Sequence, residues 1–535
     1  MLRVRATALT ASVALWTVMA TAPARLNAQR YRIEYTVALT DPASHLYGIT
    51  LFVGGVTGQP VDLQMPVWSP GRYAKMDFAR NVQEFSATSS DGKPLRWTKL
   101  NGSKWRVTPG SARSVTVRYR VFANAPMSGT FSVVDTLHGN WNGPSLFMYV
   151  DGHKTDPVEL SVVAPENWTI INGDVTRPGQ RLFKFPNYDL MADTPTEVAP
   201  PGSLLLDMFV VDNRNYRVMV HHNGPVPDSL RERFVHEVES IVRYENTVFG
   251  PPPLEQYTFL FHIGFAGGDG MEHLYSTQIQ HPRAWSENTA VLPGVSTASH
   301  EYFHVWNVKR VRPAALGPFD YTTEQYQPSL WVAEGWTTYY GMVTLRRAGI
   351  TGDSSFYAGM AGLIRENLTA PGRKELSARM SSFHAPFWDG APQAQPTNER
   401  NTFFSYYPKG AGIALYLDLL IRSRTNNAKS LNDAFNNLKH RTWDAPKASY
   451  YLQGRGYTED DVERVVGETV GTSMHDWFDK HVGGTEDMDY DTALSWAGLR
   501  LVRPDSGAWS LEPIPDSTPE QIRVRMGWIT GRLDR

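Results

Sequence analysis

The sequence predicts a multidomain protein, with an N-terminal all-β domain, a mixed α and β domain, a C-terminal α-helical domain and a short tail. Three observations support this. The 535 residues exceed what one hydrophobic core usually supports. The apolar fraction of 41% and the charged fraction of 20% are those of a folded globular protein. The hydrophobic pattern alternates early in the chain and follows helical spacing later.

The N-terminal 28 residues have the layout of a secretory signal peptide. Arg3 and Arg5 precede a largely apolar run, from about Ala6 to Ala22, and small residues follow. This run is shorter than the roughly 20 residues that a membrane-spanning helix needs. We therefore expect cleavage near residue 28, export to the periplasm or the exterior, and a mature protein without a membrane span.

The predicted all-β domain covers residues 29–215. Apolar side chains alternate with polar ones, and Gly, Pro and Asp separate the runs. The clearest alternating positions are Tyr31, Ile33, Tyr35, Val37, Val115, Val117, Tyr119 and Val121.

The predicted mixed domain covers residues 216–350. Helical spacing begins at Asp228 and stops at Gly250, and a strand follows at 257–263. A glycine-rich turn at 264–270 leads to two further helices, at about 296–307 and 328–347.

Residues 351–483 form the predicted α-helical domain, because helical spacing dominates there, for example over 411–422. The last part, 484–535, is polar and dotted with Pro, and it is too short to predict an independent core.

Charge and cysteine content exclude some classes of partner and site. The 52 Lys and Arg nearly cancel the 54 Asp and Glu, so no basic excess is available to neutralise nucleic acid. The chain has no Cys, which rules out disulfides and thiolate metal ligands. Any metal site must therefore use His and carboxylate side chains. The composition gives no indication of the oligomeric state.

A metal-binding pattern lies in the mixed domain. The run from His300 to His304 reads HEYFH, an HExxH pattern within a helical stretch. Residues four apart share a helix face, so both imidazoles can bind one metal ion while Glu301 lies beside it. Glu334 is a lone carboxylate on the next apolar segment, where it is costly unless paired or metal-bound. The residues therefore predict a zinc site of His300, His304 and Glu334, with Glu301 as general base.

The glycine-rich turn leads into a second acidic group. Gly268 and Gly270 allow close backbone approach, because glycine lacks a Cβ atom. A peptide lying along this strand could pair main chain to main chain and present its α-ammonium group to Glu272. We include Met271 and His273 in this predicted substrate site, although such a turn is more often only a loop.

Tyr407 stands at the start of a strongly predicted helix. Its hydroxyl could hydrogen-bond a developing oxyanion, although Tyr at such a position is commonly a core or cap residue. Five other histidines have no partner at metal-ligand spacing, and we interpret them as structural or surface residues: His221, His222, His262, His281 and His384.

Four segments together resemble the glycyl aminopeptidase family, gluzincin zinc metallopeptidases that usually end in a PDZ module. In chain order they read GDGMEH (268–273), HEYFHVWNVKRVR (300–312), WVAEGWTTYY (331–340) and SYYPKG (405–410). The segments PVWSPGRY (66–73) and DFARNV (77–82) are similar to the family's β domain. The resemblance thus spans most of the predicted domains.

The resemblance implies a thermolysin-like fold for the mixed domain and an aminopeptidase activity. Residue by residue, it implies that His300, His304 and Glu334 bind zinc. It likewise implies that Glu301 is the base, that Glu272 anchors the substrate amine and that Tyr407 is the oxyanion donor. The substrates would be peptides with a free N-terminus, and the first residue would be small, chiefly Gly.

The chain departs from the family pattern at two places. Asp269 occupies a position that is usually Gly, which bears on the substrate subsite. After Val502 the chain lacks the length and the Gly-rich loop of a whole PDZ module, so we expect that module to be incomplete or absent.

Two alternatives stay open: a zinc endopeptidase or aminopeptidase of broader specificity, and a noncatalytic exported scaffold that binds peptides. The ligand set suits zinc best but would also accept cobalt or nickel.

Overall fold

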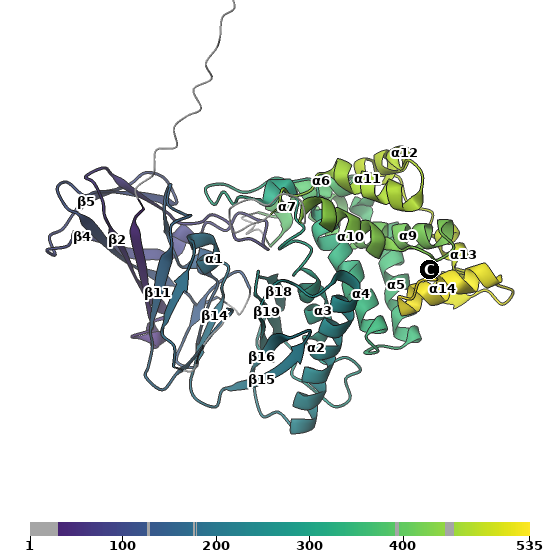
Figure 1. Cartoon of the computed structure of the whole chain (residues 1–535), viewed down its shortest axis with the longest axis horizontal. Helices are drawn as coiled ribbons and strands as arrows, with labels where there is room; N and C mark the ends of the chain where they lie inside the picture. Colours follow the sequence, from purple (N-terminus) through teal and green to yellow (C-terminus); the bar gives the residue numbers. More distant parts are fainter. Residues whose placement is uncertain are drawn as a thin grey trace, which may run out of the picture.

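The computed structural model describes residues 30–125, 129–174, 177, 179–390, 395–443 and 454–534. The predicted signal peptide, residues 1–28, lies outside these described residues. Figure 1 shows a β-rich part at one end, a helical part at the other and the strands β15 to β19 between them. None of the helices in the described ranges is both long and apolar enough to cross a lipid bilayer.

The N-terminal domain is built from strands, as predicted, and they form three sheets. A six-stranded sheet has the order β13 (Leu182–Phe185), β11 (Val158–Val163), β1 (Arg32–Ala38), β2 (Leu46–Gly54), β7 (Ser114–Phe122) and β4 (Val82–Ser89). A four-stranded sheet has the order β10 (Tyr149–Val150), β3 (Val61–Gln64), β6 (Lys104–Thr108) and β5 (Arg96–Lys99). Another has the order β12 (Thr169–Asn172), β14 (Thr196–Ala199), β9 (Gly139–Trp141) and β8 (Val133–Val134). The alternating residues Ile33, Tyr35 and Val37 are buried, which explains the period of their pattern.

The predicted end of the β domain, residue 215, falls inside a strand of the next domain. Strands β15 (Leu204–Val211) and β16 (Arg214–His222) pair with β17 (Gln256–Ile263), β19 (Ser276–His281) and β18 (Asp269–Glu272) in one five-stranded sheet, in that order. The boundary therefore lies before β15. Alternation alone could not place it, because a strand looks the same whichever sheet it joins.

Helices cover one face of this sheet and the β domain covers the other (Figure 1). The helices on the first face are α2 (Asp228–Phe249), α3 (Val295–Phe303), the π-helical turn η5 (Trp331–Trp336) and α4 (Thr337–Arg347). The alternation of β16 sorts its side chains accordingly: Val218 and Val220 join the core beneath the helices, whereas Met219 belongs to a small cluster facing the β domain.

The helical domain continues the same core rather than forming a separate one. Its elements are α5 (Asp353–Thr369), α6 (Ala378–Phe383), α7 (Ala385–Trp388), α8 (Glu399–Thr402), α9 (Tyr406–Arg424), α10 (Leu431–Thr442), α11 (Glu459–Val470) and α12 (His475–Phe478). One cluster of buried apolar side chains runs from Tyr216 in the sheet to Ile529 near the end of the chain.

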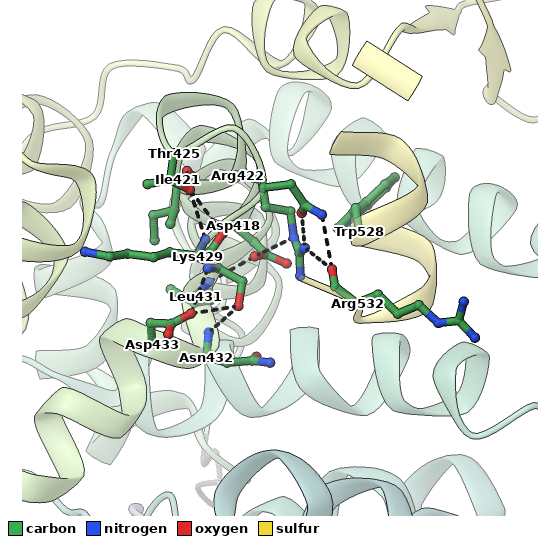
Figure 2. A network of polar contacts seen from close by, with 12 residues as sticks. Asp418, Ile421, Arg422, Thr425, Lys429, Leu431, Asn432, Asp433, Trp528 and Arg532 are labelled. Atoms are coloured by element: carbon green, nitrogen blue, oxygen red, sulfur yellow. Dashed lines mark hydrogen bonds and ion pairs between the residues drawn. The ribbon is translucent and has the colours of Figure 1, made fainter. Parts of the chain in front are cut away.

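The C-terminal residues pack onto this helical core. They form α13 (Tyr490–Trp496), the hairpin β20 (Leu499–Val502) and β21 (Ser510–Pro513), and α14 (Pro519–Thr530). A buried polar network, partly shown in Figure 2, holds α14 in place. Asp418 pairs with Arg422 at 3.1 Å, and Arg422 donates to the Arg532 carbonyl at 3.4 Å. Arg347 donates to the Trp528 carbonyl at 2.8 Å. This C-terminal segment is thus an integral part of the helical domain.

The β domain interlocks with the rest of the chain. Tyr73, from a loop of the β domain, belongs to the core shared by the sheet and the helices. In return, Leu274, Phe319 and Tyr321 pack into the core of the β domain. This exchange of side chains brings the loop around Tyr73 to the predicted metal site.

Candidate active site

The structure brings the three predicted metal ligands together. Helix α3 and its C-terminal turn place the Nε2 atoms of His300 and His304 3.0 Å apart. Oε2 of Glu334 lies 3.5 Å from the former and 3.3 Å from the latter. Donor atoms around a tetrahedral zinc ion with bonds of about 2.0–2.1 Å are roughly 3.3 Å apart. The spacing and the chemistry of this donor set therefore fit zinc.

Asn307 holds two of these ligands in position. Nδ1 of His304 lies 2.5 Å from the carbonyl oxygen of Asn307, and when this nitrogen donates, Nε2 keeps its lone pair for a metal. The Asn307 side chain donates to the Val332 carbonyl at 2.9 Å and to the Thr337 hydroxyl at 3.1 Å. One residue thus fixes both the His304 ring and the segment that carries Glu334.

Glu334 lies on a π-helical turn rather than on the regular helix predicted for 328–347. A Cβ atom on Gly335 would lie 2.4 Å from the Gly410 Cα, so these two glycines let η5 and α9 cross closely. The crossing brings Tyr407, one turn before Gly410, to the site. Its ring stacks on that of His300 with centroids 6.1 Å apart. Burial and the charge of Glu334 raise the pKa of the Tyr407 phenol, so it stays protonated and can donate a hydrogen bond.

Glu301 occupies the space that Gly270 leaves. A Cβ atom on Gly270 would lie 2.1 Å from Oε1 of Glu301. Oε2 of Glu301 is buried and has no hydrogen-bond partner among the described residues. Burial raises the pKa of this carboxyl, and the charges of Glu272 and Glu334 add to the rise. Such a carboxylate is free to accept a proton from a group that enters the site.

Glu272 ends the edge strand β18 and faces the same space. Glu272, Glu301 and His304 each have one donor atom within 4.8 Å of those of the other two. Glu272, Glu301 and Glu334 are 3%, 4% and 1% exposed. Among the described residues, no Lys or Arg forms an ion pair with these three carboxylates, and the imidazoles of His300 and His304 pair with Glu334. The site is therefore strongly anionic and suited to cations.

The other predicted substrate residues differ in their surroundings. Met271 is buried beside Gly71 and Gly129, two glycines of the β domain on which a Cβ atom would lie within 2.3 Å of its side chain. A Cβ atom on Gly268 would have ordinary contact, 3.6 Å from Pro282, so no close approach requires glycine there. His273 pairs with Asp193 at 3.0 Å and belongs to a buried network between the domains.

Asp269, the departure from the family pattern, forms an ion pair with Arg72 of the β domain. It also accepts a hydrogen bond from the Gly129 amide at 3.2 Å. The guanidinium group of Arg72 thus compensates the charge of the extra carboxylate. The same ion pair joins β18 to the loop that carries Tyr73.

Tyr73 is a site residue that the sequence patterns did not reveal. Its hydroxyl donates a 2.7 Å hydrogen bond to Oε1 of Glu334. Burial and the charge of Glu334 raise the pKa of this phenol, which keeps the donor proton in place. The segment PVWSPGRY contains Tyr73 and indicates the family, but nothing in its local pattern points to a partner 261 residues away.

Two family models match parts of the chain. Residues 34–200 match the Peptidase M61 N-terminal domain, and residues 294–413 match the M61 glycyl aminopeptidase family. No curated protein matches the chain.

Two solved structures are similar to the chain to different degrees. An aminopeptidase N family protein from Idiomarina loihiensis is 26% identical, with 88% of this chain and 79% of that chain covered and a TM-score of 0.79. An M1 zinc metallopeptidase from Deinococcus radiodurans is 17% identical, with 83% of this chain and 90% of that chain covered and a TM-score of 0.46.

Proposed function

The chain belongs to the M61 peptidase family, and on that premise we propose that it is a zinc-dependent aminopeptidase that removes a small N-terminal residue, Gly or Ala, from peptides. Its membership makes it a peptidase. The metal, the preference for a free N-terminus and the small first residue are parts of the proposal.

One observation carries the proposal: three buried carboxylates converge without a Lys or Arg partner among the described residues. Uncompensated buried charges are costly. A zinc ion and the α-ammonium group of a peptide together carry three positive charges, which match Glu272, Glu301 and Glu334. An endopeptidase substrate would bring no ammonium group to Glu272.

The protein groups have distinct roles in the proposed reaction. Zinc held by His300, His304 and Glu334 would polarise the scissile carbonyl and acidify water to a pKa of about 7. Glu301 takes a proton from the attacking water and passes it to the leaving amine.

Two further residues orient the substrate. Glu272 receives the α-ammonium group by a charge-assisted hydrogen bond, which sets the scissile bond one residue away from it. Tyr407 donates its phenolic proton in a hydrogen bond to the developing oxyanion. Strand β18 lies at the edge of its sheet, so an extended peptide could pair with its main chain.

We further propose that the mature enzyme acts outside the cytoplasm, in the periplasm or the exterior. The signal-peptide pattern of residues 1–28 supports this part of the proposal.

The test is hydrolysis of glycyl and alanyl peptides, free and N-acetylated, by purified protein. We expect cleavage of the free peptides only, loss of activity with a chelator and recovery with zinc. Equal cleavage of acetylated peptides would identify an endopeptidase instead. Zinc binding without cleavage of either set would favour a noncatalytic scaffold. Recovery with cobalt or nickel but not with zinc would contradict the choice of metal.

A further inference from the structure

A second group of metal-ligating side chains lies between the β domain and the five-stranded sheet. Oε1 of Glu197 lies 3.1 Å from Nδ1 of His221 and 3.2 Å from Nδ1 of His138. One donor atom from each of these three residues lies within 4.8 Å of the others. Glu197, His138 and His221 are 0%, 3% and 6% exposed. This group is separate from the proposed catalytic residues.

Strand pairing and the contact between two sheets build the group. Glu197 of β14 is the register partner of Asn140 on β9, and His138 comes just before β9. His221 of β16 is the register partner of His262 on β17, so both imidazoles lie on the face toward the β domain. Figure 1 shows β14 on the side of the β domain that faces β16.

His262 holds the other oxygen of the carboxylate. Its Nε2 lies 3.1 Å from Oε2 of Glu197, whereas His138 and His221 both face Oε1. A ligand carboxylate is commonly fixed in this way by a hydrogen bond from outside the set. The ring of Phe265 packs against His221 with centroids 4.8 Å apart and covers the group.

Hydrogen bonding alone does not account for the arrangement. Nδ1 of His138 is buried near Oε1 but lies outside hydrogen-bond geometry, and it has no hydrogen-bond partner among the described residues. Nor does a Lys or Arg of the described residues form an ion pair with Glu197. A fully buried carboxylate is costly without a cation, which a protonated imidazole or a bound metal ion can supply here. Nδ1 of His138 is close to Oε1 of Glu197 but makes no hydrogen bond with it. This arrangement fits two atoms that both bind one ion lying between them.

The spacing matches that of the catalytic set. The Nδ1 to Oε1 distances of 3.1 and 3.2 Å resemble the distances of 3.0 to 3.5 Å among His300, His304 and Glu334. These distances agree with the separation of roughly 3.3 Å expected for donors around a tetrahedral zinc ion, and the donor atoms of the second group all lie within 4.8 Å of one another. Two imidazole nitrogens and a carboxylate oxygen are donors that suit zinc.

We propose that Glu197, His138 and His221 bind a second zinc ion, which joins the β domain to the catalytic sheet. The ligands are Oε1 of Glu197 and Nδ1 of each histidine, and water completes the set. The ion links His138 and Glu197 on one side to His221 on the other. It stabilises the folded chain by mass action, because the three ligands meet only when the sheets are docked. This inference does not depend on the proposed reaction.

The test measures the zinc content of the purified full-length protein. Metal is first removed, the protein is then equilibrated with excess Zn²⁺, and gel filtration removes the unbound ions. We expect two zinc ions per chain in the wild type. Glu334→Gln, in the proposed catalytic set, and His138→Gln should each retain one, and the double variant none. His222→Gln is a matched control, because His222 neighbours His221 on β16 but is outside the group, and it should retain two.

A second measurement covers the case in which His138→Gln does not fold. Zinc should raise the melting temperature of Glu334→Gln, since only the second site remains to bind it. Saturation of the folded wild type at one zinc per chain would overturn the proposal. So would a Glu334→Gln variant that binds no zinc, or a His138→Gln variant that still binds two.

Discussion

The hydroxyl of Tyr73, from the β domain, donates a 2.7 Å hydrogen bond to Oε1 of Glu334, while Oε2 of that carboxylate faces His300 and His304. The β domain therefore supplies a residue that orients a proposed metal ligand. This contact gives a structural reason for the two parts of the chain to act as one unit: the loop around Tyr73 completes the surroundings of the site.

Replacing Tyr73 by Phe should weaken zinc binding at the catalytic set. Groups that orient a metal ligand typically contribute about 10- to 100-fold in affinity. We expect a loss in this range in competition with a chromophoric chelator. Tyr35→Phe is the control, because it removes a buried hydroxyl of the same domain that donates to the Met148 carbonyl at 2.9 Å. Equal zinc affinity in the two variants would contradict the role of Tyr73.

Gly270→Ala should displace the Glu301 carboxylate, because the new methyl group would lie 2.1 Å from Oε1. Misplacement of a catalytic group by about 1 Å can cost 10²-fold in rate. We expect a fall in kcat/KM of about that size with zinc content retained. Gly268→Ala, whose methyl group would have ordinary contact with Pro282 at 3.6 Å, should keep nearly full activity. Similar activity in both variants would show that the contact with Glu301 is unimportant.

Glu301→Gln should abolish turnover without removing zinc, since the amide cannot take a proton from water. General-base groups contribute roughly 10²-fold or more. We expect kcat to fall by at least that factor in assays with free glycyl peptides, while metal analysis shows unchanged zinc. Residual activity above about one hundredth of the wild type would mean that another group is the base.

Glu272→Gln should reduce kcat/KM for peptides with a free N-terminus, because it replaces a charge-assisted hydrogen bond to the ammonium group by a weaker one. The expected loss is about 10-fold or more, from the 1.5–3 kcal/mol typical of hydrogen bonds to charged groups. Acetylated peptides provide the control, as their cleavage should stay negligible in both proteins. An unchanged kcat/KM would remove Glu272 from the amine-binding role.

Asp418→Asn should destabilise the helical domain. Asp418 is buried against Arg422 and accepts a 2.6 Å hydrogen bond from Tyr339 (Figure 2 shows the Arg422 side). Removing one member of such a buried pair costs about 3–5 kcal/mol. We expect a clearly lower melting temperature. Asp491→Asn removes one member of the exposed pair with Arg503 and should leave the melting temperature nearly unchanged.

The same pair gives a pH dependence. Burial alone would raise the pKa of Asp418, but Arg422 and Arg347 hold it below its ordinary value. A lowered folded-state pKa means that the stabilisation is complete above the unfolded value of about 3.9 and is lost as the pH falls through the folded value. The difference in melting temperature between wild type and Asp418→Asn should therefore be constant near neutrality and shrink in acid. A difference that grows in acid would contradict this sign.

Local sequence patterns were enough to predict the parts of the site that depend on local geometry. Residues four apart share a helix face, so His300 and His304 could be assigned as a pair from their spacing, and Glu334 stood out as a lone carboxylate on an apolar segment. Glu272 and Tyr407 were weaker candidates from their local patterns, the resemblance implied the same roles, and the structure places both beside this group. Alternation likewise predicted the strands of the β domain.

The contacts between distant segments follow from the tertiary fold and not from any local pattern. No local pattern indicates that Tyr73 reaches Glu334, that β15 and β16 leave the β domain, or that His221 meets Glu197 and His138. His221 and His262 looked like structural or surface residues, because neither has a partner at metal-ligand spacing along the chain. Periodicity reports only which face of an element is buried. Which element packs against that face depends on strand register and sheet docking, and these join residues that no local pattern connects.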